Sequence, residues 1–328
     1  MFINSSRCPV ENIRFPLSGM KIYHHLNEFI KPQFPIVTQG TFDGVHIGHQ
    51  KLLKRIRDLA AEKQGEVVLL TFHPHPRKVL FGKDAGLEML TCLSEKIKLM
   101  EEYGIQHLVI HPFTREFSMM EYDAFVKDVL VEKLGVKTLV IGYDHQFGHQ
   151  RRGSMSTLRE MAPGLGFEVE EIPEQEIDAI AVSSTRIRKA LKAGEVEVAA
   201  QLLGYRYHLT GRVVQGNKVG RTIGYPTANL VPNDPDKLIP ANGIYAVKVW
   251  ARQQWWNGAL SIGHRPTFDN GARTVEVHIL GFDEEIYGEE ITLGFYSYLR
   301  PELKFASVND LVQQMNQDVE QCLLILNR

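Results

Sequence analysis

The sequence predicts two domains of different fold class: an α/β domain with a doubly wound parallel sheet, then a small antiparallel β-barrel that ends in one helix. Up to Gly204, short β-branched runs alternate with amphipathic stretches, which is typical of a parallel sheet covered by helices on both faces. After Gly204, Gly, Pro and Asn become frequent and strand-like runs follow one another directly. A length of 328 residues with 44% hydrophobic residues is sufficient for two cores.

The elements of the first domain are predicted from hydrophobic periodicity. Strands are expected at 35–39, 66–72, 106–111, 137–142 and 167–172. Helices are expected at 46–64, 94–104, 120–135, 154–163 and 184–194. Residues 1–19 precede this pattern and lack the features of a signal peptide. We expect them to form an N-terminal extension that is either disordered or has a role of its own.

The second domain is predicted as a series of strands separated by turns. They are expected at 208–216, 243–252, 254–263, 273–282 and 289–300. One terminal helix is expected at 307–326, with Ser307 or Asn309 as its N-cap. Because the pattern changes at 204–208, the predicted limits are 20–204 for the α/β domain and 205–328 for the barrel domain.

Composition excludes several classes of protein. The 37 Lys and Arg residues nearly cancel the 39 Asp and Glu residues, so the chain lacks the positive surplus that favours binding to a nucleic-acid backbone. No apolar run approaches the roughly 18 residues of a membrane span. Cys8, Cys92 and Cys322 are too scattered for a disulfide framework, which indicates a reducing compartment. We therefore expect a cytoplasmic protein that binds neither nucleic acid nor membrane.

The segment GTFDGVHIGHQKLL (40–53) follows a predicted strand and opens a predicted helix. Its glycines permit a turn that brings backbone N–H groups and the positive helix end toward an anion such as phosphate. His46 and His49 are three residues apart, so both imidazoles can face one ligand and stabilise a departing pyrophosphate. Spacing alone is equally compatible with solvent-facing histidines or with half of a metal site.

The H-x-G-H element resembles that of the nucleotidylyltransferase superfamily, and GTFDGVHIGHQ is similar to the FMN adenylyltransferase half of bacterial bifunctional riboflavin kinase/FAD synthetases. Three further motifs of that family follow in order: TFHPHP (71–76), GYDHQFGHQRRG (142–153) and SSTRIR (183–188). The resemblance implies a Rossmann-like domain that binds ATP and FMN. It implies catalytic roles for His46, His49 and Arg188. It implies binding roles for Gly40, Phe42, Asp43, Gly48, Asp144, Ser184 and Thr185.

The SSTRIR motif also has a chemical interpretation of its own. Ser183, Ser184 and Thr185 can cap a helix, while Arg186 and Arg188 bring cations to a polyphosphate. A capped surface helix with solvated arginines is the alternative. The family resemblance implies that Arg188 contacts the ATP phosphates.

The roles of two segments in the first domain cannot be assigned from their residues alone. At Asp144 the family carries Asn or Asp, but it often has Phe and Arg next, where this chain has His145 and Gln146. His73 and His75 share a face if the segment is a strand, and a metal pair is conceivable there. Since neither cysteines nor an H-E-x-x-H element accompany them, we expect them to lie in a substrate loop.

The segment GRVVQGNKVGRTIGYPTANL (211–230) is rich in glycine but lacks the order of a Walker loop. Such a loop can wrap ATP through its backbone amides, and its glycines include Gly216, Gly220 and Gly224. Thr227 and Asn229 are two apart, so in an extended segment both can offer oxygen atoms to magnesium. An ordinary turn before a strand is the alternative.

Glu276 lies in RTVEVHIL (273–280), where alternation places Val275 and Val277 on the opposite face. A carboxylate there can act as general base for an attacking hydroxyl, although a solvent-facing glutamate has the same pattern. The chain from Tyr207 onward resembles riboflavin kinases through GYPTANL, NGIYAV, SIGHRPTF, VEVHIL and LRPELKF. That resemblance implies that Thr227 and Asn229 bind nucleotide and Mg²⁺ and that Glu276 is the base.

The resemblances together imply an enzyme that phosphorylates riboflavin to FMN and adenylylates FMN to FAD, with ATP as co-substrate and Mg²⁺ as cofactor. Its expected partners are riboflavin, FMN, FAD and ATP, and nothing in the sequence sets an oligomeric state. Three alternatives stay open: a chain with one working domain, a flavin-binding sensor or carrier, and a metal hydrolase. The hydrolase would use Asp43, His46, His49, His73 and His75.

Overall fold

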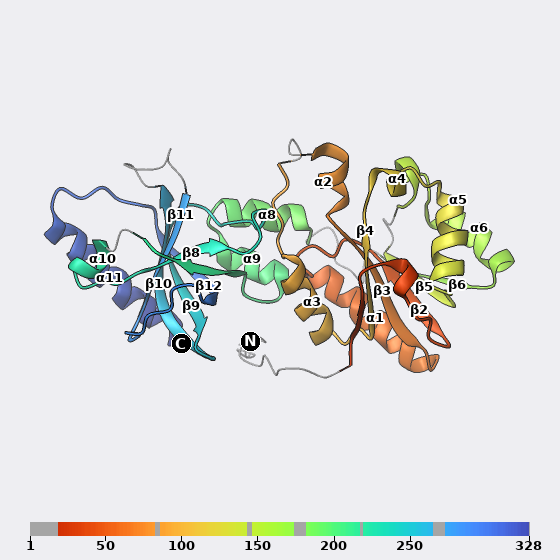
Figure 1. Ribbon diagram of the computed structural model, residues 1–328, viewed down its shortest axis with the longest axis horizontal. Coiled ribbons are helices and arrows are strands. Elements are labelled where there is room, and N and C mark those ends of the chain that lie inside the picture. Colours follow the sequence, from red (N-terminus) through yellow and green to blue (C-terminus); the bar gives the residue numbers. More distant parts are fainter. Residues whose placement is uncertain are drawn as a thin grey trace, which may run out of the picture. The chain divides into compact units, whose positions relative to one another are not determined.

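The computed structural model describes residues 19–82, 86–142, 146–173, 182–216, 219–264 and 273–327. The chain forms two compact units, one ending at Ser184 and the other beginning at Thr185 (Figure 1). Asp144, His145 and the predicted extension up to residue 18 lie outside the described residues. None of the helices in the described parts of the chain has the length and hydropathy for a membrane crossing.

The first unit is built on a six-stranded sheet in which every pair of neighbours is parallel. Its order is β1-β4-β3-β2-β5-β6. The strands are β1 (Lys21–Tyr23), β2 (Pro35–Gln39), β3 (Glu66–His73), β4 (His107–Pro112), β5 (Thr138–Gly142) and β6 (Glu168–Ile172). All five predicted strands are confirmed. The edge strand β1, which pairs with β4, was not predicted because three residues are too few to show a period.

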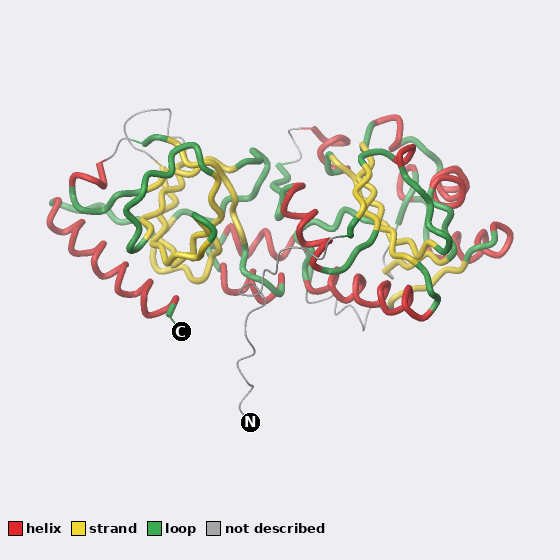
Figure 2. Tube along the Cα trace, turned by 60° about the horizontal axis from the view of Figure 1, so that its bottom comes forward, coloured by secondary structure: helices red, strands yellow, loops and turns green. Residues whose placement is uncertain are grey.

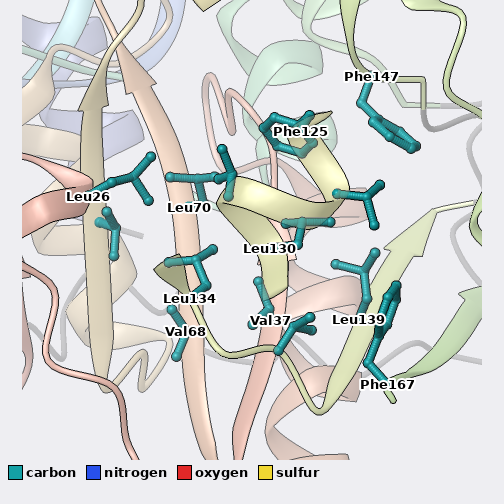
Figure 3. Packing of buried hydrophobic residues seen from close by; sticks show 14 of the residues in the cluster. Leu26, Val37, Val68, Leu70, Phe125, Leu130, Leu134, Leu139, Phe147 and Phe167 are labelled. Atoms are coloured by element: carbon teal, nitrogen blue, oxygen red, sulfur yellow. The ribbon is translucent and has the colours of Figure 1, made fainter. Parts of the chain in front are cut away.

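Helices connect these strands. They are η2 (Leu26–Glu28), α1 (Ile47–Glu62), α2 (Pro76–Phe81), α3 (Leu93–Glu102), α4 (Arg115–Ser118), α5 (Tyr122–Ala124), η4 (Phe125–Lys133), η5 (His149–Arg151) and α6 (Met155–Leu165). The single helix expected at 120–135 is divided, because α5 continues into the π-helical η4. Phe125 and Leu130 of η4, and Leu134 directly after it, pack over the sheet (Figure 3).

Alternate residues of the strands supply two separate cores. Val37, Val68 and Leu70 pack with η4 and α6 on one face of the sheet (Figure 3). Their neighbours Ile36 and Leu69 pack with α1 and α3 on the other face. Strands that are buried on both faces appear in the sequence as continuous apolar runs. Each fully buried Val or Leu side chain stabilises the folded state by about 1.5–3 kcal/mol. The doubly wound class is thereby confirmed.

The second unit is a closed antiparallel barrel of six strands in the order β10-β11-β8-β7-β12-β9 (Figure 2). Its strands are β7 (His208–Val214), β8 (Ala228–Pro232), β9 (Gly243–Ala251), β10 (Gln254–His264), β11 (Arg273–Ile279) and β12 (Glu290–Arg300). Its helices are α8 (Ser184–Lys192), α9 (Val196–Leu203), α10 (Val219–Thr222) and α11 (Val308–Leu326). The predicted barrel is confirmed, whereas α9, α10 and the short β8 were not predicted as elements.

The terminal helix α11 packs against the barrel through a small core that includes Ala246, Cys322 and Leu326. Ser307 is its N-cap, because its side chain accepts a hydrogen bond from the Asp310 N–H; the prediction of Ser307 is confirmed over Asn309. At the start of this unit, α8 and α9 belong with the barrel: the Ala241 N–H donates to the Leu191 C=O at 2.9 Å. The domain limits 20–204 and 205–328 stay a prediction.

Candidate active sites

Loop 40–46 connects β2 to α1 at the carboxyl end of the parallel sheet. The strand order reverses at β2, because β3 and β4 continue on one side of it whereas β5 and β6 lie on the other. In open α/β sheets, ligands bind outside the carboxyl ends of the strands at such a switch point. The predicted phosphate motif therefore lies where this fold favours a ligand.

The backbone of the loop is unusual. Phe42 and Val45 have φ of 46° and 35°, in the left-handed region, which is costly for a β-branched residue such as Val45. Both side chains are buried in the core beside α1. Gly40 makes a close approach, because a Cβ there would lie 3.0 Å from the Phe42 ring and the ring would have to shift slightly. Surrounding contacts must hold this conformation.

Asp43 supplies several of those contacts. Its carboxylate is 2% exposed and accepts hydrogen bonds from the N–H groups of Leu90 and Thr91 at 3.0 and 3.2 Å. The Ser184 hydroxyl donates to the Asp43 C=O at 3.0 Å, and the Gly44 N–H donates to Thr91 Oγ1. The structure therefore gives Asp43 the role of holding the loop, while its expected contact with nucleotide stays a prediction.

The structure brings His46 and His49 together. His46 is the N-cap of α1, and its Nδ1 accepts a hydrogen bond from the His49 N–H at 3.4 Å. The rings stack with centroids 3.7 Å apart and planes 15° apart, and the Phe42 ring lies 5.1 Å from His49 on centroids. Gly48 is buried in the first turn between them. Two imidazoles and a helix N-terminus thus lie at one place.

His49 is held neutral by its surroundings. Burial lowers its pKa well below the usual range, and His46 and Lys96 lower it further. Its Nδ1 is buried and has no hydrogen-bond partner among the described residues. A buried polar atom without a partner is costly. A neutral imidazole with such an atom can form a hydrogen bond with an incoming phosphate group.

The SSTRIR residues fall at the division between the units. Ser184 begins α8, Thr185 and Arg186 are exposed in its first turn, and Arg188 is half-buried one turn later. Arg188 belongs to the barrel unit, whereas His46 and His49 belong to the α/β unit. Its contact with ATP phosphates therefore stays a prediction.

In the barrel, Thr227, Asn229 and Glu276 meet across two strands. Asn229 of β8 and Glu276 of β11 are direct partners in the antiparallel register. The Thr227 hydroxyl, two residues before Asn229, donates to Glu276 Oε2 at 3.4 Å. Val275 and Val277 are buried on the opposite face of β11, as the alternation predicted. Two oxygen-bearing side chains and a half-buried carboxylate are thus adjacent.

The glycine-rich segment lies directly on these residues. A Cβ at Gly216 would lie 2.3 Å from Asn229 Nδ2, and a Cβ at Gly220 would lie 2.2 Å from the Tyr225 C=O. Gly224 has φ of 86°, which glycine adopts without strain. Gly216 and Gly220 therefore have no room for a side chain. The backbone of this segment can approach the strand face that carries Thr227.

Sequence reasoning missed two residues at these sites. Lys96 of α3 is 5% exposed, and its Nζ donates to the Thr41 C=O at 2.7 Å. His278 Nδ1 donates to the Pro226 C=O at 2.8 Å, which ties β11 to the segment before Thr227. The available signals were weak: Lys96 has the helical spacing of the apolar face of α3, and His278 lies on the same strand face as Glu276.

His73 and His75 lie where β3 ends and α2 begins. His75 is the N-cap of α2, and its Nδ1 accepts a hydrogen bond from the Arg77 N–H at 3.2 Å. His73 is exposed at the end of β3. Within the described ranges, no group of three His, Cys, Asp or Glu residues could hold a metal ion. The metal-hydrolase alternative has no support there.

The fold presents two candidate ligand sites, one at the switch point of an α/β sheet and one beside a carboxylate on a closed barrel. Residues 31–186 match the family model described as FAD synthetase, and residues 203–326 match the model described as riboflavin kinase. Both matches agree with the resemblances seen in the motifs.

Full-length relatives carry both parts. The bifunctional riboflavin kinase/FMN adenylyltransferase of Listeria monocytogenes is 42% identical over 284 residues, covering 86% of this chain and 90% of that protein. The Haemophilus influenzae protein with the same description is 38% identical over 292 residues, covering 89% of this chain and 94% of its own length. This chain belongs to the bifunctional riboflavin kinase/FMN adenylyltransferase family.

A solved structure from Streptococcus pneumoniae, described as a macrolide-efflux protein, matches with a TM-score of 0.82 and 32% identity. The match covers 92% of this chain and 97% of that one. That description names a different activity from that of the curated relatives. The structural match supports the fold, and the assignment to the family rests on the two family models and the curated relatives.

Proposed function

We propose that this chain phosphorylates riboflavin with ATP to give FMN in the barrel, and adenylylates FMN with a second ATP to give FAD in the α/β unit. The convergence of Thr227 and Asn229 with Glu276 supports the first reaction most directly. The stacked His46 and His49 at the switch point support the second.

In the kinase reaction, Glu276 accepts the proton of the terminal ribityl hydroxyl. The freed oxygen attacks the γ-phosphorus of ATP, the bond to the β-phosphate oxygen breaks, and ADP leaves. The backbone around Gly216, Gly220 and Gly224 binds the phosphates through N–H groups. Glu276 fits this role because it is half-buried and lies beside the Thr227 hydroxyl.

The residues of the barrel site also fit Mg²⁺. Thr227 and Asn229 carry hard oxygen donors on one face, next to the Glu276 carboxylate. Magnesium prefers such oxygen ligands and is held by few protein groups together with substrate phosphates. We propose that Thr227 and Asn229 hold it. When bound, Mg²⁺ supplies charge neutralisation on the ATP phosphates.

In the adenylyl transfer, an oxygen of the FMN phosphate attacks the α-phosphorus of ATP, and pyrophosphate leaves with the bridging oxygen. His46 and His49 would donate hydrogen bonds to the polyphosphate and stabilise its growing charge. Arg188 would add a cation there, and Ser184 and Thr185 would bind phosphate at the start of α8. Asp144 would contact nucleotide or flavin.

The cytoplasmic location stays part of the proposal. It is supported by Cys92 and Cys322, both of which are buried thiols. The predicted limits 20–204 and 205–328 are proposed as the units of the two activities. The family match at 203–326 begins near the proposed boundary, and the match at 31–186 lies inside the first unit.

Chromatography of flavin products tests both reactions at once. After incubation with riboflavin, ATP and Mg²⁺, we expect FMN first and FAD later. FMN without FAD would leave a chain with one working domain, and tightly bound riboflavin without any product would favour a sensor or carrier. The His49→Gln variant should accumulate FMN, whereas Glu276→Gln should convert added FMN to FAD but leave riboflavin unchanged.

A further inference from the structure

Lys96 is a buried cation that the proposed reactions do not use. It lies on α3, 5% exposed, and its Nζ donates to the Thr41 C=O at 2.7 Å. Burial lowers the pKa of Lys96, and the Asp43 carboxylate opposes that shift. Burying an ammonium group is expensive, and apolar residues of similar size often serve stability equally well. A lysine at this position therefore calls for a reason other than packing.

One reason is the shape of loop 40–46. Asp43 accepts hydrogen bonds from the Thr91 N–H and hydroxyl, and the Gly44 N–H donates to the Thr91 hydroxyl oxygen. Lys96 adds a third point of attachment at Thr41. The loop is thus fixed at three places to α3 and to the segment that leads into it. These bonds offset the strain of its left-handed residues.

A second reason is the charge itself. His46 and Lys96 both lower the pKa of His49, in addition to the larger effect of burial. A protonated His49 would be repelled by the Lys96 ammonium, and burial strengthens such repulsion between like charges. The cation therefore disfavours a proton on His49, while its hydrogen bond to Thr41 sets where the loop lies.

We propose that Lys96 is a positioning residue for adenylyl transfer: it holds loop 40–46 through Thr41, and its charge acts on His49 in the helix that follows the loop. The inference rests on the proposed function, because it assigns the loop and His49 to FAD formation. Lys96 exchanges no proton with substrate and breaks no bond. A small shift of a loop that positions reacting groups can cost about 100-fold in rate.

Two variants separate the hydrogen bond from the charge. Lys96→Met removes both, and Lys96→Gln keeps an N–H donor for Thr41 without the charge. Lys98→Met is the matched control, because Lys98 is exposed on the same helix. Each full-length protein is assayed for FAD formation from FMN and ATP. Riboflavin phosphorylation by the same sample is the internal standard, because it occurs in the barrel unit.

We expect kcat for FAD formation to fall about 100-fold in Lys96→Met and less in Lys96→Gln, while FMN formation stays within about twofold of wild type. Lys98→Met should match wild type in both reactions. In ligand-free protein, NMR should show the His49 titration midpoint at higher pH in both Lys96 variants than in wild type. The His49 ring signal is assigned by its loss in His49→Gln.

Wild-type FAD formation in both Lys96 variants would overturn the proposal, as would a His49 midpoint that stays unchanged. A loss of FAD formation with an unchanged midpoint would reduce Lys96 to a structural residue. If Lys96→Met does not fold in the α/β unit, the results for Lys96→Gln alone decide between these outcomes. If wild type makes no FAD, the proposed function fails, and the titration in ligand-free protein still decides whether Lys96 acts on His49.

Discussion

Glu276 lies directly opposite Asn229 across strands β11 and β8, and its Oε2 accepts a hydrogen bond from the Thr227 hydroxyl at 3.4 Å. This bond is longer than a close O–H···O bond. Hydrogen bonds of catalytic groups are often long before substrate binds. The Thr227 hydroxyl therefore binds this carboxylate only weakly, as expected if Glu276 is the base that we propose.

Replacement of Glu276 by Gln should lower kcat for riboflavin phosphorylation by about 10²- to 10⁴-fold, the usual contribution of a general base. KM should change little, because the amide keeps the size of the side chain. Steady-state assays with riboflavin measure the kinase, and FAD formation from added FMN serves as internal control. Glu320→Gln, on an exposed position of α11, should have no effect. Kinase activity near that of wild type would remove Glu276 from its assigned role.

Replacement of Gly216 by Ala should impair the kinase by displacing Asn229, since the new Cβ would lie 2.3 Å from its Nδ2. We expect kcat/KM for ATP to fall by up to about 100-fold. Gly164→Ala is the control, because a Cβ at that position of α6 meets nothing within 4 Å and alanine favours a helix. An unchanged kcat/KM would show that the glycine segment does not shape the ATP site.

Replacement of Asp43 by Asn should loosen loop 40–46. The carboxylate accepts N–H bonds from Leu90 and Thr91, and an amide can satisfy only part of that set, at a cost of about 1–3 kcal/mol in unfolding free energy. FAD formation should fall while FMN formation continues. Hydrogen exchange of the loop, compared with exposed Asp58→Asn, measures the loosening. Equal exchange in both variants would contradict the anchoring role.

The stability of the α/β unit should decrease as the pH falls from about 6.5 to 4. Burial, with a smaller contribution from His25, lowers the pKa of His111 from 6.5 to about 4. In that window the unfolded chain binds a proton that the folded chain does not, so acid favours unfolding. The loss is on the order of 2–3 kcal/mol.

The measurement is the urea midpoint at several pH values, followed by hydrogen exchange in β4. His111→Phe should weaken the dependence of the urea midpoint on pH. Part of the dependence should remain, because the pKa of His49 is lowered as well. His24 is exposed, so the control variant His24→Phe should show the same dependence on pH as the wild type. A dependence of equal size in His111→Phe would assign the effect to other groups.

Much of the fold could be predicted from the sequence because it is encoded locally. The five strands between 35 and 172 were found from apolar runs, and Ser307 from the side chain that caps a helix. The three-residue β1 was missed because it is too short to show a period, and β8 was missed because it directly follows the glycine-rich segment and ends at a proline. The π-helical winding of η4 was missed because its apolar spacing also fits an α-helix.

The sequence by itself determined the two fold classes, the family motifs and the residue types suited to phosphate chemistry. Only the tertiary structure decided that Glu276 meets Asn229, that His46 stacks on His49, and that Lys96 reaches the loop before α1. The physical reason is that periodicity and capping act over a few residues. Strand pairing and the burial of a charged group depend instead on which distant segments the folded chain brings into contact.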